Sequence, residues 1–526
     1  MGNERIIAIS KRLLSFCLAL CFAVLLTFSC TLMAACEVEG EEFPPSDNIT
    51  NFQSLSTVNF ENINGKTVTA DLFARAEDEA LNSPNVGQGI LIYQCIKYKE
   101  KNPEKEVYLS CTSFHFSVVA SVCIDPESNY FGYMRSLYDE EFDEDGFYRI
   151  SYLLVRAAQL GINVVVIGQL DANPVWQGEE DRYDYHFDEY FESHLEDESV
   201  IEGKKVGDFL NFKKANWTSY GDKSASDMMH VKSCTVTNYL DYNGVEHGAG
   251  VWLSSMNVDG IYPNGYSAHG LQTGIILSEH EEIRRVVYNY TTIMADYCGQ
   301  EDSALFRNKI NKMNTSQTDL ILEGRGEEIP LEERIVYLGS ESDPVFEMYF
   351  TPVGGNAGTW ETTYNPFSKY ISKLNPSVSG ANAITFAWNN VKYLNNFEFS
   401  KTLTNTLVYA FTNNARLNNK LYLHLPGFET EKLSGLVEGE NIGRKSVNDV
   451  SLVCHNKDFQ LSYVENGVRY YVTVLNSLNF HQGAMSYQAN TFLVIKETKQ
   501  TGNDLYVDFG KAVTAGVIDE NDRIIK

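Results

Sequence analysis

Apolar and polar positions alternate in two hairpins that lie far apart in the chain. The first reads HVKSCTVTNYLDYNGVEHGAGVWLSSMN, from His230 to Asn257, and the second reads HNKDFQLSYVENGVRYYVTVLNSLN, from His455 to Asn479. Each opens with His-x-Lys, crosses an Asn-Gly turn and returns on a segment that ends in Ser-x-Asn. Alternation with β-branched and aromatic residues around Asn-Gly predicts strand, tight turn and strand in both copies.

The segments around the two hairpins follow a common order. Before and after the first hairpin, the pattern predicts strands over Glu106–Val118, Ile162–Leu170 and Gly270–Leu277, and helices over Tyr148–Leu160 and Ser278–Cys298. Around the second, it predicts strands over Phe346–Thr351, Ala383–Trp388, Lys420–Pro426 and Asn490–Lys496, and helices over Asn365–Leu374 and Phe399–Asn413. Strands alternating with helices predict an α/β fold, and the repeated order predicts an internal duplication.

The composition divides the chain into segments. Polar residues with Pro44-Pro45 predict a tether, and residues 171–227 are acidic and aromatic, as expected of an insertion with short helices. The predicted divisions are a leader over 1–36, a tether over 37–60, a first half over 61–298, a crossover linker over 299–343, a second half over 344–500 and a C-terminal tail over 501–526.

The N-terminal segment has the pattern of a secretory signal peptide. Basic residues precede an apolar run from Leu13 to Phe28, and small residues follow. Leu32-Met33-Ala34-Ala35-Cys36 is similar to a bacterial lipobox, which predicts lipidation of Cys36. Simple cleavage after Ala35 and an uncleaved anchor are the alternatives. The expected location is therefore exported and extracytoplasmic, with the protein anchored to the membrane at the cell surface.

Charge and cysteine spacing narrow the function classes. The formal net charge of −28 opposes broad attraction to nucleic acid or to an anionic membrane. The six cysteines after the leader form no CxxC pair, which argues against a zinc site. The acidic run Asp139–Asp145 (DEEFDED) is interpreted as a solvated loop, with cation binding as the alternative.

The repeated residues fit phosphoryl chemistry when two copies face each other. An imidazole is a competent nucleophile at phosphorus, and a second imidazole can protonate the leaving oxygen and then activate water. Lysine ammoniums and asparagine amides donate to phosphoryl oxygens, where negative charge builds up. In a strand, residues i and i+2 point to one face, so each His-x-Lys projects its two functional groups together.

These paired motifs resemble those of the phospholipase D superfamily. The resemblance rests on His230-x-Lys232 with Ser254-Ser255-Met256-Asn257 and on His455-x-Lys457 with Asn476-Ser477-Leu478-Asn479. It implies two α/β halves, each a β-sheet flanked by helices, related by a pseudo-twofold axis with one site at their interface. We expect no metal and no other cofactor, because the lysines of the motifs supply the cations, and a monomer, because the duplication removes the need for a dimer.

The resemblance assigns a role to each motif residue. His230 is the expected nucleophile and His455 the general acid and then base, with the reverse assignment left open. Phosphate would be bound by Lys232, Lys457, Asn257 and Asn479. Ser255 and Ser477 are expected to add hydroxyl donors.

The chain departs from the family pattern at the motif aspartates. Thr237 and Ser462 stand where the family motif HxKxxxxD has Asp. The favoured function is an exported phosphodiesterase that cleaves or transfers a phosphodiester, with a phospholipid as the favoured substrate. The first alternative is a nuclease or nucleotide phosphodiesterase related to the tyrosyl-DNA phosphodiesterase branch, whose motifs lack the Asp. The second is a non-catalytic surface protein that retains the fold.

Overall fold

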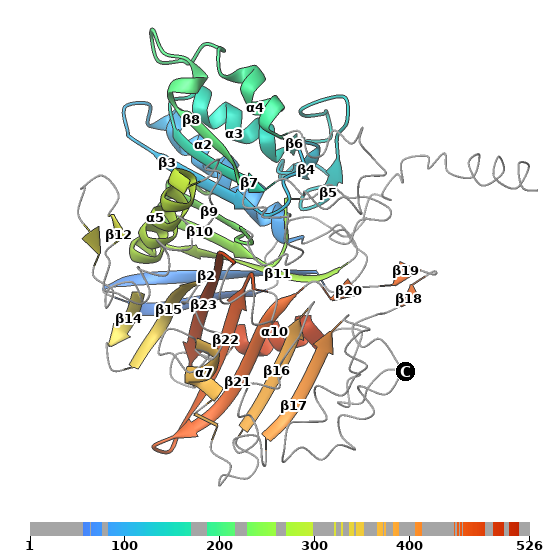
Figure 1. Ribbon diagram of the computed structural model, residues 1–526, viewed down its shortest axis with the longest axis vertical. Helices are drawn as coiled ribbons and strands as arrows, with labels where there is room; N and C mark the ends of the chain where they lie inside the picture. The colour runs from blue at the N-terminus through green and yellow to red at the C-terminus, as the bar shows by residue number, and fades with distance from the viewer. Residues whose placement is uncertain are drawn as a thin grey trace, which may run out of the picture. The chain divides into compact units, whose positions relative to one another are not determined.

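The computed structural model of the chain contains two large β-sheets with helices packed on them (Figure 1). All the residues that it describes belong to one unit, Ile49–Lys526. They are residues 56–63, 65–75, 83–169, 187–215, 229–258, 270–297, 320–321, 328–329, 336–340, 343–351, 366–371, 373–374, 382–388, 406–412, 446–447, 450–451, 453–454, 456–478, 488–498 and 504–514.

The first sheet is built mainly by the N-terminal half of the chain. Its strands lie side by side in the order β1 (Ser56–Ile63), β2 (Lys66–Arg75), β11 (Gly270–Ser278), β10 (Glu246–Ser254), β9 (Ser233–Leu240), β3 (Tyr108–Ser113), β7 (Asn163–Gln169) and β8 (Leu210–Ala215). A short strand from the other half, β20 (Val453–Cys454), pairs in parallel with the start of β11. The two halves therefore share backbone hydrogen bonding immediately before the second His-x-Lys motif.

The second sheet has the same strand order as the first. It runs β14 (Val336–Ser340), β15 (Asp343–Thr351), β23 (Asn490–Glu497), β22 (Val468–Asn476), β21 (Lys457–Glu465), β16 (Asn382–Trp388) and β17 (Thr406–Thr412). In both sheets, five successive antiparallel pairings are followed by a parallel one, β3 with β7 and β16 with β17. The matching order is what an internal duplication predicts, while the pseudo-twofold relation in space stays a prediction.

The two motif hairpins are confirmed as strand pairs in register. β9 pairs with β10, and β21 pairs with β22, each across its Asn-Gly turn. Asn466 and Gly467 both have positive φ, at 51° and 79°, as a two-residue hairpin turn requires. These turns lie at the far end of each hairpin, so both the His-x-Lys and the Ser-x-Asn segments lie at the opposite, buried end.

Period-2 alternation gives the first sheet two apolar faces. Val164 and Val166 of β7 pack with α2 (Pro84–Lys101), α3 (Ile150–Gln159) and α4 (Phe187–His194). Val165 and Ile167 point to the other face, against α5 (Glu281–Tyr297) and an apolar cluster that includes the second sheet. The first sheet is thus buried on both faces, as its nearly continuous apolar strands predict.

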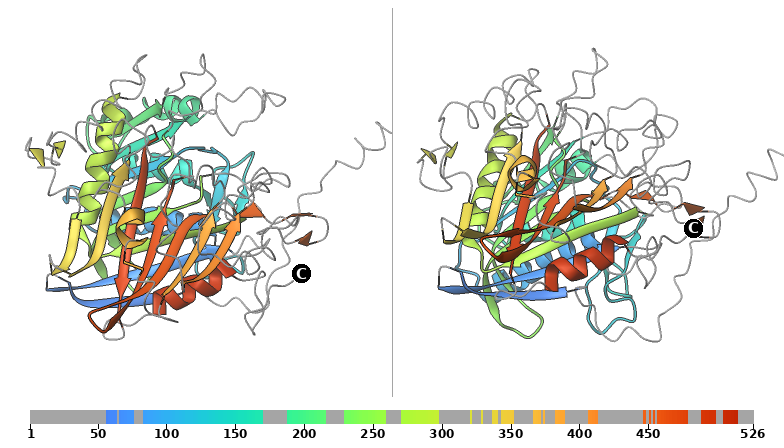
Figure 2. Two further views of the ribbon diagram at one scale, coloured as in Figure 1. Left: turned by 60° about the horizontal axis from the view of Figure 1, so that its bottom comes forward. Right: turned by 90° about the horizontal axis from the view of Figure 1, so that it is seen from below.

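The apolar cluster between the two sheets draws side chains from both halves of the chain. Phe60 of β1 meets Phe346 of β15 edge to face, with ring centroids 4.9 Å apart, and Tyr290 of α5 lies 4.5 Å from Phe350. The C-terminal helix α10 (Asp504–Thr514) packs against β1 and β2 and reaches β22 (Figure 2). Both ends of the described chain therefore contribute to the contact between the sheets.

Several sequence-based boundaries differ from the structure. The helix predicted over Phe399–Asn413 is wrong: residues 406–412 form strand β17, because TLVYAFT pairs in parallel along the whole of β16. The predicted insertion contains β8, which extends the first sheet, and the predicted linker contains β14, which begins the second. The predicted tail contains α10, and β1 starts at Ser56, inside the predicted tether. The strand predicted over residues 420–426 lies outside the described residues.

No helix in the described part of the chain is both long and apolar enough to cross a membrane.

The buried side chain of His280 makes the stability of the fold depend on pH. Its side chain precedes α5 and is fully buried, and its Nδ1 accepts the Ile283 backbone N–H at 3.2 Å. Burial lowers the pKa of His280 to about 3. In the unfolded chain the His280 imidazole takes up a proton near pH 6.5, whereas in the folded chain it stays neutral until the pH is much lower. The free energy of unfolding therefore falls as the pH drops below about 6.5.

We therefore expect the wild type to lose stability faster than His280→Asn on acidification. Asparagine also caps helices well and does not titrate, so the difference isolates the imidazole. Between pH 6.5 and 4.5 the free energy of unfolding of the wild type should fall relative to the variant by about 1.4 kcal/mol per pH unit. Urea unfolding at several pH values measures this, and parallel curves for the two proteins would contradict it.

Candidate active site

The first His-x-Lys motif is buried at the start of β9. His230 is 3% exposed and Lys232 is fully buried. The His230 backbone N–H donates to the Ala489 carbonyl at 2.9 Å, just before β23 of the second sheet, and the Lys232 ammonium donates to the His230 carbonyl at 2.9 Å. The motif is therefore fixed partly by the other half of the chain.

Asn257 completes the first motif at the end of the return strand. It is 3% exposed, and its carbonyl accepts the side-chain amide of Asn85, from α2, at 2.5 Å. Its own side-chain oxygen is buried and has no hydrogen-bond partner among the described residues. Rotation of this amide by 180° exchanges the oxygen for an N–H2 group, so Asn257 can present donors at this point.

The second motif is held by its own return strand. Lys457, the first residue of β21, is fully buried. Asn476 at the end of β22 donates its side-chain amide to the Lys457 carbonyl and accepts the Leu478 backbone N–H at 2.7 Å. The predicted partners His455 and Asn479 lie outside the described residues.

The serines of the two Ser-x-Asn segments make equivalent contacts. Ser255 donates its backbone N–H to the Thr273 carbonyl at 2.9 Å, and its Oγ accepts the Thr273 N–H at 3.0 Å. Ser477 makes the same reciprocal pair with Thr491, at 3.2 Å in both directions. Both hydroxyls thus hold the return strand to its neighbour, and their expected role as donors to substrate stays a prediction.

A direct contact joins the two motifs. The His230 ring bonds through Nδ1 to the backbone carbonyl of Ser477. A carbonyl can only accept, so Nδ1 carries the proton in the neutral ring and Nε2 carries the lone pair. Ser477, the residue after Asn476, therefore sets the tautomer of the imidazole in the opposite motif and places the lone pair of the neutral ring on Nε2.

Phe114 forms an aromatic wall beside the first motif. Its ring centroid lies 5.2 Å from that of His230, and the Lys232 ammonium lies 5.7 Å from the ring centre. The side chain is only partly buried and follows β3 directly. The sequence carries no signal for this contact, because nothing along the chain marks a residue after β3 as a neighbour of β9.

Asp458 is a second residue that the motif pattern did not single out. It is 1% exposed, and burial raises its pKa to about 7. Its two oxygens contact the Asn476 backbone N–H and the Thr273 hydroxyl. The available signal was an acidic residue directly after Lys457, at the start of a strand in which polar and apolar residues alternate.

The two positions that replace the family's motif aspartates lie inside the strands. Thr237 of β9 accepts the Tyr108 backbone N–H at 3.1 Å. Ser462 of β21 is 4% exposed and lies between Ala383 and Tyr471 of the neighbouring strands. Both make contacts within their own sheet.

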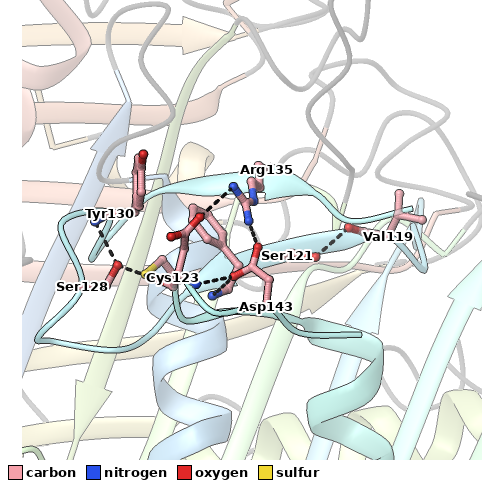
Figure 3. A network of polar contacts seen from close by, with 9 residues as sticks. Val119, Ser121, Cys123, Ser128, Tyr130, Arg135 and Asp143 are labelled. Atoms are coloured by element: carbon pink, nitrogen blue, oxygen red, sulfur yellow. Dashed lines mark hydrogen bonds and ion pairs between the residues drawn. The ribbon is translucent and has the colours of Figure 1, made fainter. Parts of the chain in front are cut away.

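Asp143 of the acidic run Asp139–Asp145 has a cationic partner. Arg135 of β5 (Met134–Ser136) forms an ion pair with Asp143 and stacks on the Phe147 ring, with its guanidinium carbon 4.0 Å from the ring centre (Figure 3). The same carboxylate accepts the backbone N–H groups of Asp145 and Phe147 at 3.0 and 3.1 Å. Asp143 is therefore occupied in closing its loop.

No protein-family model and no curated protein matches the chain. Among solved structures it is similar to phosphatidylserine synthase from Haemophilus influenzae, with 11% identity, a TM-score of 0.45, and coverage of 84% of this chain and 86% of that one. Polyphosphate kinase from Porphyromonas gingivalis has 9% identity and a TM-score of 0.39 over 80% of this chain and 45% of its own. The chain thus spans less than half the length of that kinase.

Yeast tyrosyl-DNA phosphodiesterase is also similar, with 9% identity and a TM-score of 0.32 over 81% of this chain and 89% of its own. All three are members of the phospholipase D superfamily. At these identities and TM-scores the likeness carries no argument about reaction or substrate, which rest on the site itself.

We expect Asn476→Ala to destabilise the second motif. The change removes the side-chain bonds to the Lys457 carbonyl and the Leu478 N–H and leaves both groups buried. The free energy of unfolding should fall by about 1–3 kcal/mol, measured by urea unfolding. Asn211→Ala on the exposed side of β8 is the control and should change it by less than about 0.5 kcal/mol. If the two substitutions lower the free energy of unfolding by the same amount, the side-chain bonds of Asn476 do not stabilise the second motif.

Proposed function

We propose that this protein is a phosphodiesterase that needs no metal and works through a phosphohistidine on His230. The observation that supports this most is the bond between His230 Nδ1 and the Ser477 carbonyl, which joins the two repeated motifs and places the lone pair of the neutral ring on Nε2. The buried ammoniums of Lys232 and Lys457 belong to the same two motifs. They supply the positive charge that a phosphoryl transition state needs.

The reaction would have two displacements at phosphorus. In the first, Nε2 of His230 attacks, a P–N bond forms and the P–O bond to the leaving group breaks, while the leaving oxygen takes a proton from His455. In the second, His455 removes a proton from water, the resulting hydroxide attacks phosphorus and the P–N bond breaks. The lysines and Asn257 would stabilise the phosphoryl oxygens in both steps, and Asn479 would do so from the second motif.

A phospholipid is the proposed substrate class. The predicted export places the protein where lipid is at hand, and the net charge of −28 opposes attraction to a polyanionic nucleic acid. The second candidate is a nuclease or nucleotide phosphodiesterase. It is favoured by Thr237 and Ser462, since loss of both motif aspartates is typical of the tyrosyl-DNA phosphodiesterase branch.

We expect the protein to hydrolyse bis-p-nitrophenyl phosphate in the presence of EDTA. His230→Ala and His455→Ala should each lower kcat/KM by at least about a thousandfold, because nucleophile and general acid act as one unit. His194→Ala, on the partly exposed end of α4, is the matched control and should leave the rate unchanged.

The same proteins tested on phosphatidylcholine vesicles and on single-stranded DNA separate the two substrate classes. Cleavage of phosphatidylcholine alone supports a phospholipid as the substrate, and cleavage of single-stranded DNA alone supports the nuclease. Activity that survives both histidine substitutions would refute the mechanism. A folded protein without activity on any of these substrates would support the non-catalytic surface protein.

We further propose export and lipid anchoring through Cys36. In a bacterial host that processes lipoproteins, the wild type should partition into the detergent phase of Triton X-114, because two buried acyl chains hold a protein at a membrane. Cys36→Ala should move it to the aqueous phase. Wild-type protein in the aqueous phase, cleaved after Ala35, would instead support simple secretion.

A further inference from the structure

Asp458 is a buried titratable group that the proposed chemistry does not use. It follows Lys457 in β21, so its side chain and that of Asn456 point to the opposite face of the strand from Lys457. Both reach the same residue of the first half, Thr273 in β11, whose hydroxyl lies 2.7 Å from the Asn456 side-chain oxygen and also bonds Asp458 Oδ2. The start of β21 therefore contacts β11 of the first sheet through these two side chains.

The other carboxyl oxygen of Asp458 holds the end of the return strand. Asp458 Oδ1 accepts the Asn476 backbone N–H at 2.7 Å. The next residue, Ser477, presents its carbonyl to His230 Nδ1. A continuous series of contacts thus leads from Thr273 in the first half, through Asp458 and the Asn476–Ser477 segment, back to the imidazole of the first half.

The charge of Asp458 decides which groups donate and which accept in the hydrogen bonds around the Thr273 hydroxyl. The Thr273 hydroxyl has one hydrogen and two neighbours, Asn456 and Asp458. With a protonated carboxyl, Asp458 donates to Thr273, which donates to the Asn456 oxygen. With an ionised carboxyl, Thr273 must donate to Asp458, and Asn456 must turn its N–H2 group toward Thr273. Gain or loss of one proton reverses the whole series next to Lys457.

The equivalent position in the first half holds no carboxyl. Ser233 follows Lys232 as Asp458 follows Lys457, and its hydroxyl pairs with Thr112 of the neighbouring strand at 2.8 Å. One half therefore has a neutral hydroxyl pair at this position and the other has an ionisable group. Strand formation alone does not require the acid, because the first hairpin forms without one.

We propose that Asp458 is a positioning residue for the phosphoryl reaction, holding the Ser477 carbonyl against His230 and tying the second motif to Thr273. This inference rests on the proposed function. Asp458 touches neither the phosphate-binding nor the nucleophilic atoms. It acts through the peptide groups that orient them.

The carboxyl also makes the site sensitive to pH near neutrality. Burial raises the pKa of Asp458 to about 7, and the nearby Lys457 ammonium offsets part of that rise. The residues that face it from adjacent strands, Thr273, Asn476 and Ala387, are uncharged. Above neutral pH a buried negative charge beside Lys457 would oppose the negative charge that develops on the phosphoryl oxygens.

The test compares pH profiles of kcat/KM between pH 5.5 and 8.5 for the wild type, Asp458→Asn and Glu497→Gln. Asparagine keeps a neutral side chain that can accept from Asn476 and donate to Thr273 at every pH. Glu497 is the matched control: it is fully buried, burial also raises its pKa to about 7, and it binds the N–H groups of Leu505 and Tyr506 in α10, away from both motifs.

We expect Asp458→Asn to match the wild type within about twofold at pH 6. At pH 8.5 it should exceed the wild type several-fold, up to about thirtyfold if the ionised form is inactive, because about one carboxyl in thirty keeps its proton 1.5 pH units above its pKa. Glu497→Gln should keep the wild-type profile. Thr273→Val should lower the rate at all pH values, because it cuts the link between the halves.

The outcomes separate this inference from the proposed function. If the wild-type activity depends on His230 and Asp458→Asn has the wild-type profile, the inference is wrong and the proposed function stands. Activity that does not depend on His230 overturns both. The unfolding midpoint in urea gives a second measure: the wild type should lose stability relative to Asp458→Asn as the pH rises from about 4 to about 7, with a levelling off above 7, since the unfolded carboxyl ionises near pH 4 and the folded one near 7. If the difference in midpoint between the wild type and Asp458→Asn is the same at pH 6 and at pH 8, the Asp458 carboxyl does not titrate in that range.

Discussion

Burial of strand ends is the constraint on which the structure depends. A strand that stops inside a protein leaves peptide groups that water cannot reach, and each must find a partner. Here the ends of both motif hairpins are buried. Part of their hydrogen bonding comes from the opposite sheet: Ala489 binds the His230 N–H, Ser477 binds the His230 ring, and β20 pairs with β11. The geometry of the candidate site is therefore a product of the packing of one half on the other.

The same constraint explains why many polar side chains are buried at the ends of the motif hairpins. Thr273 and Thr491 each exchange two bonds with a serine, and Asn476 bridges two peptide groups that would otherwise be unpaired. These contacts fix the backbone around the two lysines, and the Lys232 ammonium itself donates to the His230 carbonyl. A preorganised cation is worth more to a developing negative charge than one that must reorganise, because the cost of holding it was met on folding.

Much of the fold could be predicted from the sequence where local pattern decides. The Asn-Gly turns, the alternation of β9 and β22, and the apolar face of α3 are all local signals, and the structure confirms those elements. Strand β17 was missed because periodicity cannot tell whether a short apolar run such as TLVYAFT is a strand or part of a buried helix, and its pairing with β16 decides. The His-x-Lys motifs were found because they repeat. Asp458 and Phe114 were missed because their partners, Thr273 and His230, are distant in the chain.

The difference between Asp458 and Ser233 has a consequence for how such a site can evolve. If each half were a separate, identical subunit, any substitution would appear twice in the assembly, and two buried carboxyls would have to be accommodated instead of one. Each buried carboxyl costs free energy when it ionises. Once both copies lie on one polypeptide, each can change without the other, and an acid can be introduced on one side alone. With both halves on one polypeptide, one half can carry an ionisable group at this position while the other carries a pair of hydroxyls.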